Sequence, residues 1–245
     1  MPQAPGLVMG GGTSLSASFK LNAIRWACPP TAVLFDLDGT LADTAGDLGG
    51  ALNQLRVARG LDPLPLDVLR PYASAGARGL IGVGLDIHPG DPEFEPLRLA
   101  FLDAYMRCLA DTTVLFDGMS ELLYELSARG LKWGIVTNKP HRFTLPVMEG
   151  LGLREDAAVI ISGDSTAHAK PHPLPLLTAC EEMGVPPASV LYVGDDLRDI
   201  QVAQAAAMPS AAAQWGYIGH NGDISEWGAD VIVAQPLDLL AHLPA

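Results

Sequence analysis

An apolar run at residues 32–35 leads directly into two aspartates one residue apart, in the motif Asp36-Leu37-Asp38-Gly39-Thr40. Residues two apart on an extended chain project to the same side, so the carboxylates of Asp36 and Asp38 can point at one spot. Two like charges this close repel each other, which requires a cation between them or a proton on one of them. The motif predicts a buried strand that ends in a phosphoryl-transfer site, with Thr40 as a hydroxyl donor for substrate binding.

Two simpler explanations of this motif remain open at this point. Asp-Gly is an ordinary turn dipeptide. An acidic loop can also bind calcium, but the calcium-loop pattern needs further oxygen ligands at alternating positions and a closing glutamate. Residues 39–42 read Gly-Thr-Leu-Ala and supply none of these ligands. The rest of the chain must therefore distinguish a turn from a catalytic site.

Composition and charge restrict the partners of the protein. The chain has 245 residues, 49% of them apolar and 18% charged, which suits a compact α/β enzyme with an inserted unit. The net charge of −13 and the lack of a Lys/Arg stripe argue against a nucleic-acid partner. No segment approaches the run of about 18 apolar residues that a membrane span needs, so no membrane partner is expected. An anionic substrate then requires a metal ion or a few placed cations.

The cysteines and the N-terminal segment indicate the compartment. Cys28, Cys108 and Cys180 lie far apart without a Cys-x-x-Cys pair, which fits a reducing cytoplasm better than a disulfide framework or a zinc site. Residues 1–17 are rich in Gly, Pro and Ser and lack the features of a signal peptide. We predict a disordered N-terminal extension over residues 1–30 and a cytoplasmic location. The sequence leaves the oligomeric state open.

Beyond this segment, short apolar runs alternate with amphipathic stretches, which is the pattern of a parallel sheet covered by helices. The predicted strands are residues 32–35, 131–136, 159–161, 190–193, 231–233 and a shorter one at 211–214. Helices are predicted at 120–128 and 199–207. Pro140 and Pro173 suit the first turns of two more helices. The predicted fold class is therefore α/β, with a Rossmann-like parallel sheet.

Residues 47–116 break this alternation and contain no convincing strand. They instead carry two helical stripes of mostly apolar residues, Leu48, Leu52 and Leu55 in one, and Phe94, Leu97, Phe101, Ala104 and Cys108 in the other. We predict an all-helical cap over residues 47–116, inserted between core segments 31–46 and 117–245. Such a cap can close over the site and exclude water.

Two further motifs carry polar groups suited to phosphate. Thr137 and Asn138 follow the second predicted strand and can hold phosphate oxygens through a hydroxyl and an amide, although Thr-Asn is as often a turn. Lys170 lies in a loop before a helix, where a lysine is commonly just solvated. Neither motif is decisive by itself.

A third motif places acids after the fourth strand. Asp195 and Asp196 follow this strand directly, and Asp199 falls in the first helical turn beyond, a position that acidic residues favour anyway because they oppose the helix dipole. In open parallel sheets, sites lie outside the carboxyl ends of the strands, where the strand order reverses. If the first strand is central, with the second and fourth on its two sides, Asp36, Thr137 and Asp195 meet at that point.

Together, these motifs resemble those of the haloacid dehalogenase (HAD) superfamily, in its phosphatase branch with a helical cap inserted after the first motif. The matching elements, in the family's order, are the 36–40 motif, Thr137, Lys170 and residues 194–199. The resemblance covers about residues 31–235 and implies an HAD-like core. Residues 137–140, 170–173 and 194–200 are similar to bacterial phosphoglycolate phosphatases and equally to phosphatases of N-acetylmuramic acid 6-phosphate.

The resemblance implies a magnesium-dependent phosphatase of a small phosphorylated metabolite, with 2-phosphoglycolate as the first candidate substrate. Asp36 would attack the phosphorus and form an aspartyl-phosphate. Asp38 would protonate the leaving alkoxide and then take a proton from water. Mg²⁺ would be held by Asp36, the backbone carbonyl of Asp38 and Asp195, and Asp199 would support these ligands without binding the ion directly.

Other residues follow from the same resemblance. Thr137, Asn138 and Lys170 would hold the transferring oxygens. A substrate carboxylate would be recognised by a cap arginine, and the candidates are Arg70, Arg78, Arg98 and Arg107, with Arg78 chosen as the substrate contact. Asp196 departs from the family, where Ser or Thr is frequent, and its role is open.

Three alternatives remain beside a phosphatase. A dehalogenase of this superfamily lacks the second aspartate, so Asp38 argues against that chemistry. A sugar phosphomutase uses the same two aspartates and would return phosphate to a sugar rather than to water. A non-catalytic module on this fold would bind phosphorylated ligands without releasing phosphate.

Overall fold

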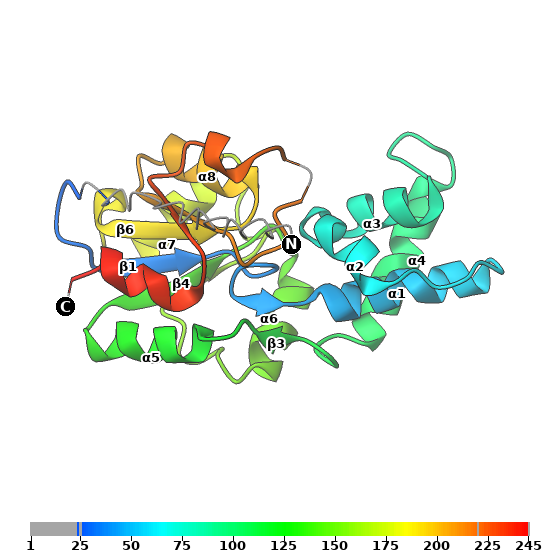
Figure 1. Cartoon of the computed structure of the whole chain (residues 1–245), viewed down its shortest axis with the longest axis horizontal. Helices are drawn as coiled ribbons and strands as arrows, with labels where there is room; N and C mark the ends of the chain where they lie inside the picture. Colours follow the sequence, from blue (N-terminus) through cyan, green and yellow to red (C-terminus); the bar gives the residue numbers. More distant parts are fainter. Residues whose placement is uncertain (1–23, 25, 220, 245) are drawn as a thin grey trace, which may run out of the picture.

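The computed structural model describes residue 24, residues 26–219 and residues 221–244 (Figure 1). Its core is a six-stranded parallel sheet in the order β5-β4-β1-β6-β7-β8. The strands are β1 (Ala32–Phe35), β4 (Lys132–Val136), β5 (Ile160–Ile161), β6 (Val190–Gly194), β7 (Ser210–Ala213) and β8 (Val231–Val233). The α/β class and the arrangement of β1 between β4 and β6 confirm the prediction from the sequence.

Helices cover both faces of this sheet. The helices are α5 (Met119–Ala128), α6 (His141–Gly150), α7 (Leu174–Met183) and α8 (Leu197–Ala205). Three short 3-10 helices accompany them: η2 (Pro187–Ser189), η3 (Ile224–Glu226) and η4 (Pro236–His242). Val33 and Phe35 of β1 pack in one apolar cluster with residues of α5 and α6. Ala32 and Leu34, which project to the opposite face, pack with α7 and α8. Burial on both faces explains why the strand reads as a continuous apolar run.

The start of α8 differs from the prediction. The helix spans Leu197–Ala205 rather than residues 199–207 because Asp196 caps it. The Asp196 side chain accepts the Arg198 N–H, and the Asp199 side chain accepts the Asp196 N–H in return. This reciprocal capping box fixes the helix start two residues earlier than the apolar spacing suggested.

The segment between β1 and α5 forms a second helical unit, seen on the right of Figure 1. Its elements are α1 (Ala45–Ala58), α2 (Leu66–Leu69), the 3-10 helix η1 (Arg70–Ala75), α3 (Gly76–Leu85) and α4 (Phe94–Arg107). These helices share an apolar cluster of their own, in which Leu52, Leu80 and Phe101 are almost fully buried. The apolar stripes that the sequence displayed thus serve packing inside this unit.

One short strand contradicts the expectation of a strand-free segment over residues 47–116. β3 (Val114–Leu115) pairs antiparallel with β2 (Ala42–Asp43). The two strands lie where the chain leaves the core and where it returns. Two-residue strands carry too little periodicity to be recognised in a sequence, and their pairing depends on the return of the chain.

The prediction of a disordered extension over residues 1–30 is wrong for Ile24 and Trp26. Ile24 is buried in the apolar cluster beneath α5, and Trp26 donates its indole N–H to the carbonyl of His242. These residues are anchored because the C-terminal η4 segment lies beside them, a contact that spans more than two hundred residues of sequence. Residues 1–23 and 25 of that prediction lie outside the described residues.

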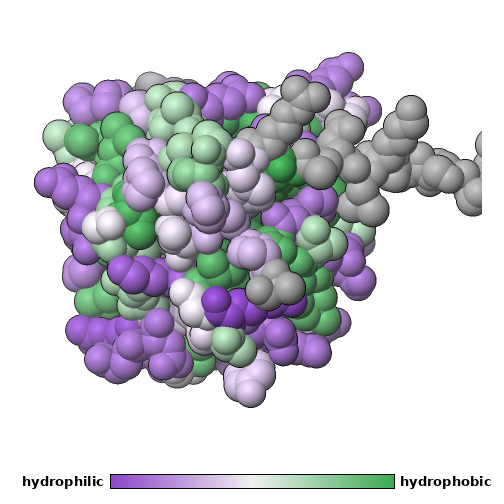
Figure 2. Space-filling view, turned by 90° about the vertical axis from the view of Figure 1, so that its left-hand side faces the viewer, coloured by the Kyte–Doolittle hydropathy of each residue, from purple (hydrophilic) through white to green (hydrophobic). Residues whose placement is uncertain are grey.

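Figure 2 views the end of the core farthest from the cap helices, and on this face hydrophilic and hydrophobic side chains are interspersed. Within the described ranges, no helix combines the length and the apolar character that crossing a bilayer requires. The three cysteines are free thiols.

The packing of β1 leads to a test of stability. Leu34 is fully buried, whereas Leu177 on α7 is 39% exposed. Leu34→Ala should lower the free energy of unfolding by about 2–5 kcal/mol, because it removes apolar contacts and leaves a cavity. Leu177→Ala should change it by only about 0.5 kcal/mol. Urea denaturation of both variants measures the difference, and equal losses would contradict this assignment of the core.

Candidate active site

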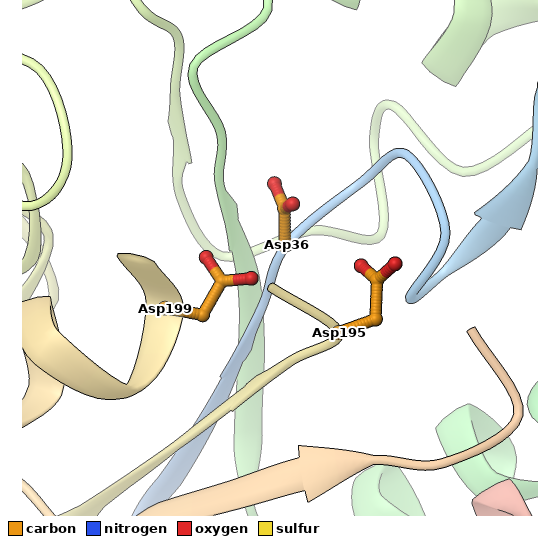
Figure 3. Close-up of side chains that lie close together, drawn as sticks. All are labelled: Asp36, Asp195 and Asp199. Carbon is orange, nitrogen blue, oxygen red and sulfur yellow. The ribbon is translucent and has the colours of Figure 1, made fainter. Parts of the chain in front are cut away.

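Three buried carboxylates meet at the carboxyl ends of β1 and β6 (Figure 3). Asp36 follows β1 directly, Asp195 follows β6, and Asp199 lies in the first turn of α8. One oxygen of each carboxylate lies within 4.8 Å of those of the other two. They come together because β1 and β6 are neighbours in the sheet, as the sequence predicted.

Asp195 is held by donors from three separate segments. Its Oδ1 accepts the Thr40 hydroxyl at 2.8 Å, and its Oδ2 accepts the Ser74 hydroxyl at 3.1 Å and the Tyr217 N–H at 2.9 Å. Burial raises the pKa of Asp195 well above its ordinary value, and the two neighbouring carboxylates raise it further. Thr40, predicted as a donor to the substrate, is bonded to Asp195 instead.

Lys170 supplies a positive charge inside this cluster. Its Nζ lies 2.9 Å from Asp36 Oδ1 and 2.7 Å from Asp199 Oδ1, and it donates to the Tyr192 hydroxyl at 2.8 Å. Burial alone would lower the pKa of Lys170, but the charges of Asp199 and Asp36 outweigh it and raise the pKa above its ordinary value. The ammonium therefore stays charged beside Asp36.

Asn138 connects the loop after β4 to the loop that carries Lys170. Its side-chain Nδ2 donates to the Lys170 carbonyl at 3.0 Å, and its Oδ1 accepts the Lys170 N–H at 2.9 Å. The Thr137 hydroxyl oxygen accepts the Lys139 N–H at 3.2 Å, so its own hydrogen remains available to a bound phosphate. Asn138 thus positions Lys170 through its side chain.

Asp38 contacts a lysine that the sequence analysis did not single out. Lys139 donates to Asp38 Oδ1 at 2.8 Å, and the Thr44 hydroxyl donates to the same oxygen at 2.6 Å. Burial alone would lower the pKa of Lys139, but the nearby Asp38 charge and Tyr105 outweigh it and raise the pKa above its ordinary value. The only sequence signal for Lys139 was its place directly after Thr137 and Asn138.

The structure gives Asp196 a role in holding the two units together. Its Oδ1 accepts from Arg198 Nε at 2.7 Å, and Arg198 Nη2 donates to the Ser74 carbonyl of the cap at 3.0 Å. Burial opposes ionisation of Asp196, but its hydrogen bonds and ion pair with Arg198 outweigh it and keep the pKa below its usual range. Asp196 therefore links α8 to the cap through Arg198.

Tyr217 is a second residue that the sequence did not reveal. Its hydroxyl accepts the N–H groups of Thr44 at 2.7 Å and Ala45 at 2.9 Å and donates to Asp43 Oδ1 at 3.1 Å. These three residues form the connection from the core into α1. Because the Tyr217 N–H also bonds to Asp195, this residue ties the aspartate cluster to the segment that leads into the cap.

A cavity of about 170 Å³ lies between the cap and the core. The predicted site residues that line it are Asp36, Asp38, Thr137, Asn138, Lys170 and Asp199. The cap contributes a largely apolar wall, formed by Leu48, Ala73, Ser74, Ala75, Gly76, Ala77, Phe101, Leu102 and Tyr105. Arg78, chosen as a substrate contact, is an exposed residue of α3 and lines a neighbouring cavity with Asp196 and Arg198.

The donor set fits a divalent cation. When all three are ionised, Asp36, Asp195 and Asp199 carry three negative charges, of which the Lys170 ammonium compensates one. Asp36 Oδ1 is buried, and the Lys170 ammonium lies 2.9 Å from it. Asp199 uses one oxygen for Lys170 and the other for the Asp196 N–H, which suits support of the site rather than direct ligation. Oxygen ligands of this kind suit Mg²⁺.

Comparison with known proteins agrees with this geometry. Residues 33–213 match the family described as haloacid dehalogenase-like hydrolase. The chain is 45% identical over 208 residues to the N-acetylmuramic acid 6-phosphate phosphatase of Pseudomonas putida, covering 85% of this chain and 93% of that one. It is also 45% identical over 210 residues to the phosphoglycolate phosphatase of Xanthomonas campestris, covering 86% and 95%.

Solved structures give the same result. The crystal structure of a predicted phosphoglycolate phosphatase from Haemophilus somnus superposes with a TM-score of 0.76 at 27% identity, covering 86% of this chain and 97% of that one. The fold and the aspartate site thus define a phosphatase of the HAD type. The chain belongs to the haloacid dehalogenase-like hydrolase family, and it is a phosphoric monoester hydrolase.

The close packing around Asp195 leads to a test with a matched control. Gly39 and Gly60 both have positive φ, +87° and +74°, so an alanine at either position meets similar backbone strain. A Cβ on Gly39 would lie 2.3 Å from Asp195 Oδ2, whereas the described structure has nothing within 4 Å of one on Gly60. Gly39→Ala should lower kcat/KM about 100-fold by displacing Asp195.

Gly60→Ala should retain the wild-type kcat/KM within about threefold, with at most a small loss of stability. Phosphate release and thermal unfolding of both variants measure the two effects. Full activity in Gly39→Ala would show that the position of Asp195 is not critical.

Proposed function

We propose that this protein is a magnesium-dependent phosphatase that hydrolyses a small phosphate monoester through an aspartyl-phosphate on Asp36. The observation that carries the proposal is the environment of Asp36, a buried carboxylate that lies in one cluster with Asp195 and Asp199. It lies beside the Lys170 ammonium, and it shares the cavity with Asp38. A nucleophile, a cation and an acid–base group are thereby placed around one point.

In the first step, a carboxylate oxygen of Asp36 attacks the phosphorus, and the bond from phosphorus to the ester oxygen breaks. The leaving alkoxide takes a proton from Asp38. Thr44 and Lys139 hold the Asp38 carboxyl through the same oxygen, which leaves its other oxygen for this transfer. The product of the step is the free alcohol and a phosphorylated Asp36.

In the second step, Asp38 accepts a proton from a water molecule, and the water oxygen attacks the same phosphorus. The bond between phosphorus and Asp36 breaks, which releases inorganic phosphate and restores both carboxyl groups. Asp38 returns to its protonated form in this step, so one residue serves as acid and then as base. The cap wall over the cavity limits the entry of bulk water.

The remaining polar groups stabilise the transferring phosphoryl oxygens. Lys170 offers its ammonium, and Thr137 offers its hydroxyl hydrogen. Asp36, Asp195 and the backbone carbonyl of Asp38 would hold Mg²⁺, with Asp199 in support, and the ion would supply positive charge that offsets the repulsion between anionic substrate and anionic nucleophile. Asn138 contributes by fixing the loop of Lys170.

Two phosphate esters are the candidate substrates. Relatives of equal identity are named for 2-phosphoglycolate and for N-acetylmuramic acid 6-phosphate. We retain 2-phosphoglycolate as the first candidate because the cavity is small. N-acetylmuramic acid 6-phosphate is the second candidate, since it is named for a relative of the same similarity.

The role of Asp36 can be tested by a substitution that conserves shape. Asp36→Asn removes the nucleophile and should lower kcat at least about a thousandfold for every ester. Asp103→Asn, which changes an exposed carboxylate of α4, should leave kcat unchanged. Phosphate release under substrate saturation measures both variants. Near-normal turnover by Asp36→Asn would refute the aspartyl-phosphate mechanism.

Metal dependence and substrate can be tested together. Phosphate release is measured for 2-phosphoglycolate, N-acetylmuramic acid 6-phosphate, hexose phosphates and nucleotides, with Mg²⁺ and with EDTA. We expect release only with Mg²⁺ and a strong preference for one ester. Mg²⁺ should also raise the melting temperature of the wild type but not of Asp195→Asn, because the ion stabilises only the folded state that binds it.

Several outcomes would contradict the proposal. Undiminished release in EDTA would exclude a metal requirement. Transfer of phosphate between two positions of a sugar without release would indicate a phosphomutase. Binding of the esters without any turnover would indicate a non-catalytic module.

A further inference from the structure

The cap arginines do not account for recognition of a substrate carboxylate. Arg70 pairs with Asp43 at 2.8 Å, Arg98 pairs with Glu95 at 2.9 Å, and Arg78 lines a different cavity. None of these arginines is among the described residues that line the cavity at Asp36. Any carboxylate on the leaving group must therefore meet other side chains.

One such side chain is Tyr105, which comes from α4 and lines the cavity. It is only 2% exposed, and within the described part of the chain its hydroxyl hydrogen finds no acceptor, although the Lys139 ammonium lies close to it. Burial raises the pKa of Tyr105 to about 12, so the hydroxyl remains a proton donor. A buried donor without an acceptor is costly, which indicates that a bound molecule supplies the acceptor.

The ring of Tyr105 is held in place by aromatic neighbours. Its centroid lies 6.4 Å from that of Phe101 in the cap and 5.4 Å from that of Phe143 in the core. A ring packed from both units has little freedom to turn its hydroxyl away from the cavity. The position of this donor is therefore fixed when cap and core are in contact.

The second side chain is Lys139, whose ammonium lies 4.7 Å from the centre of the Tyr105 ring. Lys139 lines the same cavity with a side chain that is 5% exposed. It donates to Asp38 at 2.8 Å, and an ammonium has three hydrogens, so donors remain for a ligand. A fixed hydroxyl and a positive charge thus lie together beside the residue that protonates the leaving group.

We propose that Tyr105 and Lys139 form a leaving-group subsite that binds a carboxylate of the substrate. The proposal rests on the phosphatase function above and names the group that this site recognises. A carboxylate offers only acceptors, so it satisfies the Tyr105 hydroxyl and pairs with the Lys139 ammonium at once. A leaving group without an acceptor at this point would leave the Tyr105 hydroxyl unpaired, and a cationic one would be repelled by the Lys139 ammonium.

The test compares related esters with and without this carboxylate. One pair is 2-phosphoglycolate and the phosphate ester of glycolamide, and the other is N-acetylmuramic acid 6-phosphate and N-acetylglucosamine 6-phosphate. Wild-type enzyme should prefer the carboxylate member of one pair, which also identifies the source of the carboxylate. Tyr105→Phe should reduce that preference, as a ratio of kcat/KM values, about 10-fold or more, because a hydrogen bond to a charged group is lost.

Two further variants complete the design. Tyr124→Phe removes a hydroxyl from a side chain that is 71% exposed and should keep the wild-type preference. Lys139→Gln should reduce the preference in the same direction as Tyr105→Phe, which provides a second measurement if one variant folds poorly. Turnover of p-nitrophenyl phosphate, which has no carboxylate, should stay within about threefold of wild type in Tyr124→Phe.

The outcomes separate the subsite from the proposed function. If wild type hydrolyses p-nitrophenyl phosphate but Tyr105→Phe and Lys139→Gln keep the full preference, the subsite is refuted alone. The same holds if wild type prefers the carboxylate member of neither pair. If wild type releases phosphate from no ester at all, the proposed function fails and the subsite fails with it.

Discussion

The ion pairs of the buried Lys170 ammonium support the rest of the site. They connect Asp36, directly after β1, with Asp199 in the first turn of α8. Tyr192 accepts a hydrogen bond from the ammonium, and the Asn138 side chain accepts one from the backbone N–H of Lys170. Burying charges costs several kcal/mol for each ion, and only a nearly complete set of partners offsets that cost. The network therefore specifies one arrangement of three loops, because every partial arrangement leaves a buried charge unpaired.

This arrangement still leaves excess negative charge, and the excess explains the chemistry. Three carboxylates face one ammonium, so a divalent cation can neutralise the site and admit an anionic phosphate. The cap takes part through direct bonds, since Ser74 donates to Asp195 and receives a hydrogen bond from Arg198. Contact between cap and core thus completes the surroundings of the aspartate cluster as well as the cavity wall.

Much of the fold was predictable, and the errors have physical causes. The strand order and the meeting of Asp36 with Asp195 followed from apolar runs that end in acids. The pairing of β2 with β3 and the burial of Ile24 were missed because each depends on a partner far along the chain. Arg78 was expected in a flexible glycine-rich turn, but Gly76–Leu85 form α3, on which its side chain is exposed.

The sequence by itself determined the chemistry at the strand ends, because local patterning fixes which residues follow each buried strand and parallel strands bring those ends to one edge. It did not determine which cations face which carboxylates. Only the tertiary structure revealed three features of the site: Lys139 beside Asp38, Tyr217 at the entry to α1, and the buried hydroxyl of Tyr105 without an acceptor. These contacts join the cap to the core, or loops that lie far apart in the sequence. Their geometry depends on how the helices and strands pack against one another, and a local sequence pattern does not contain that information.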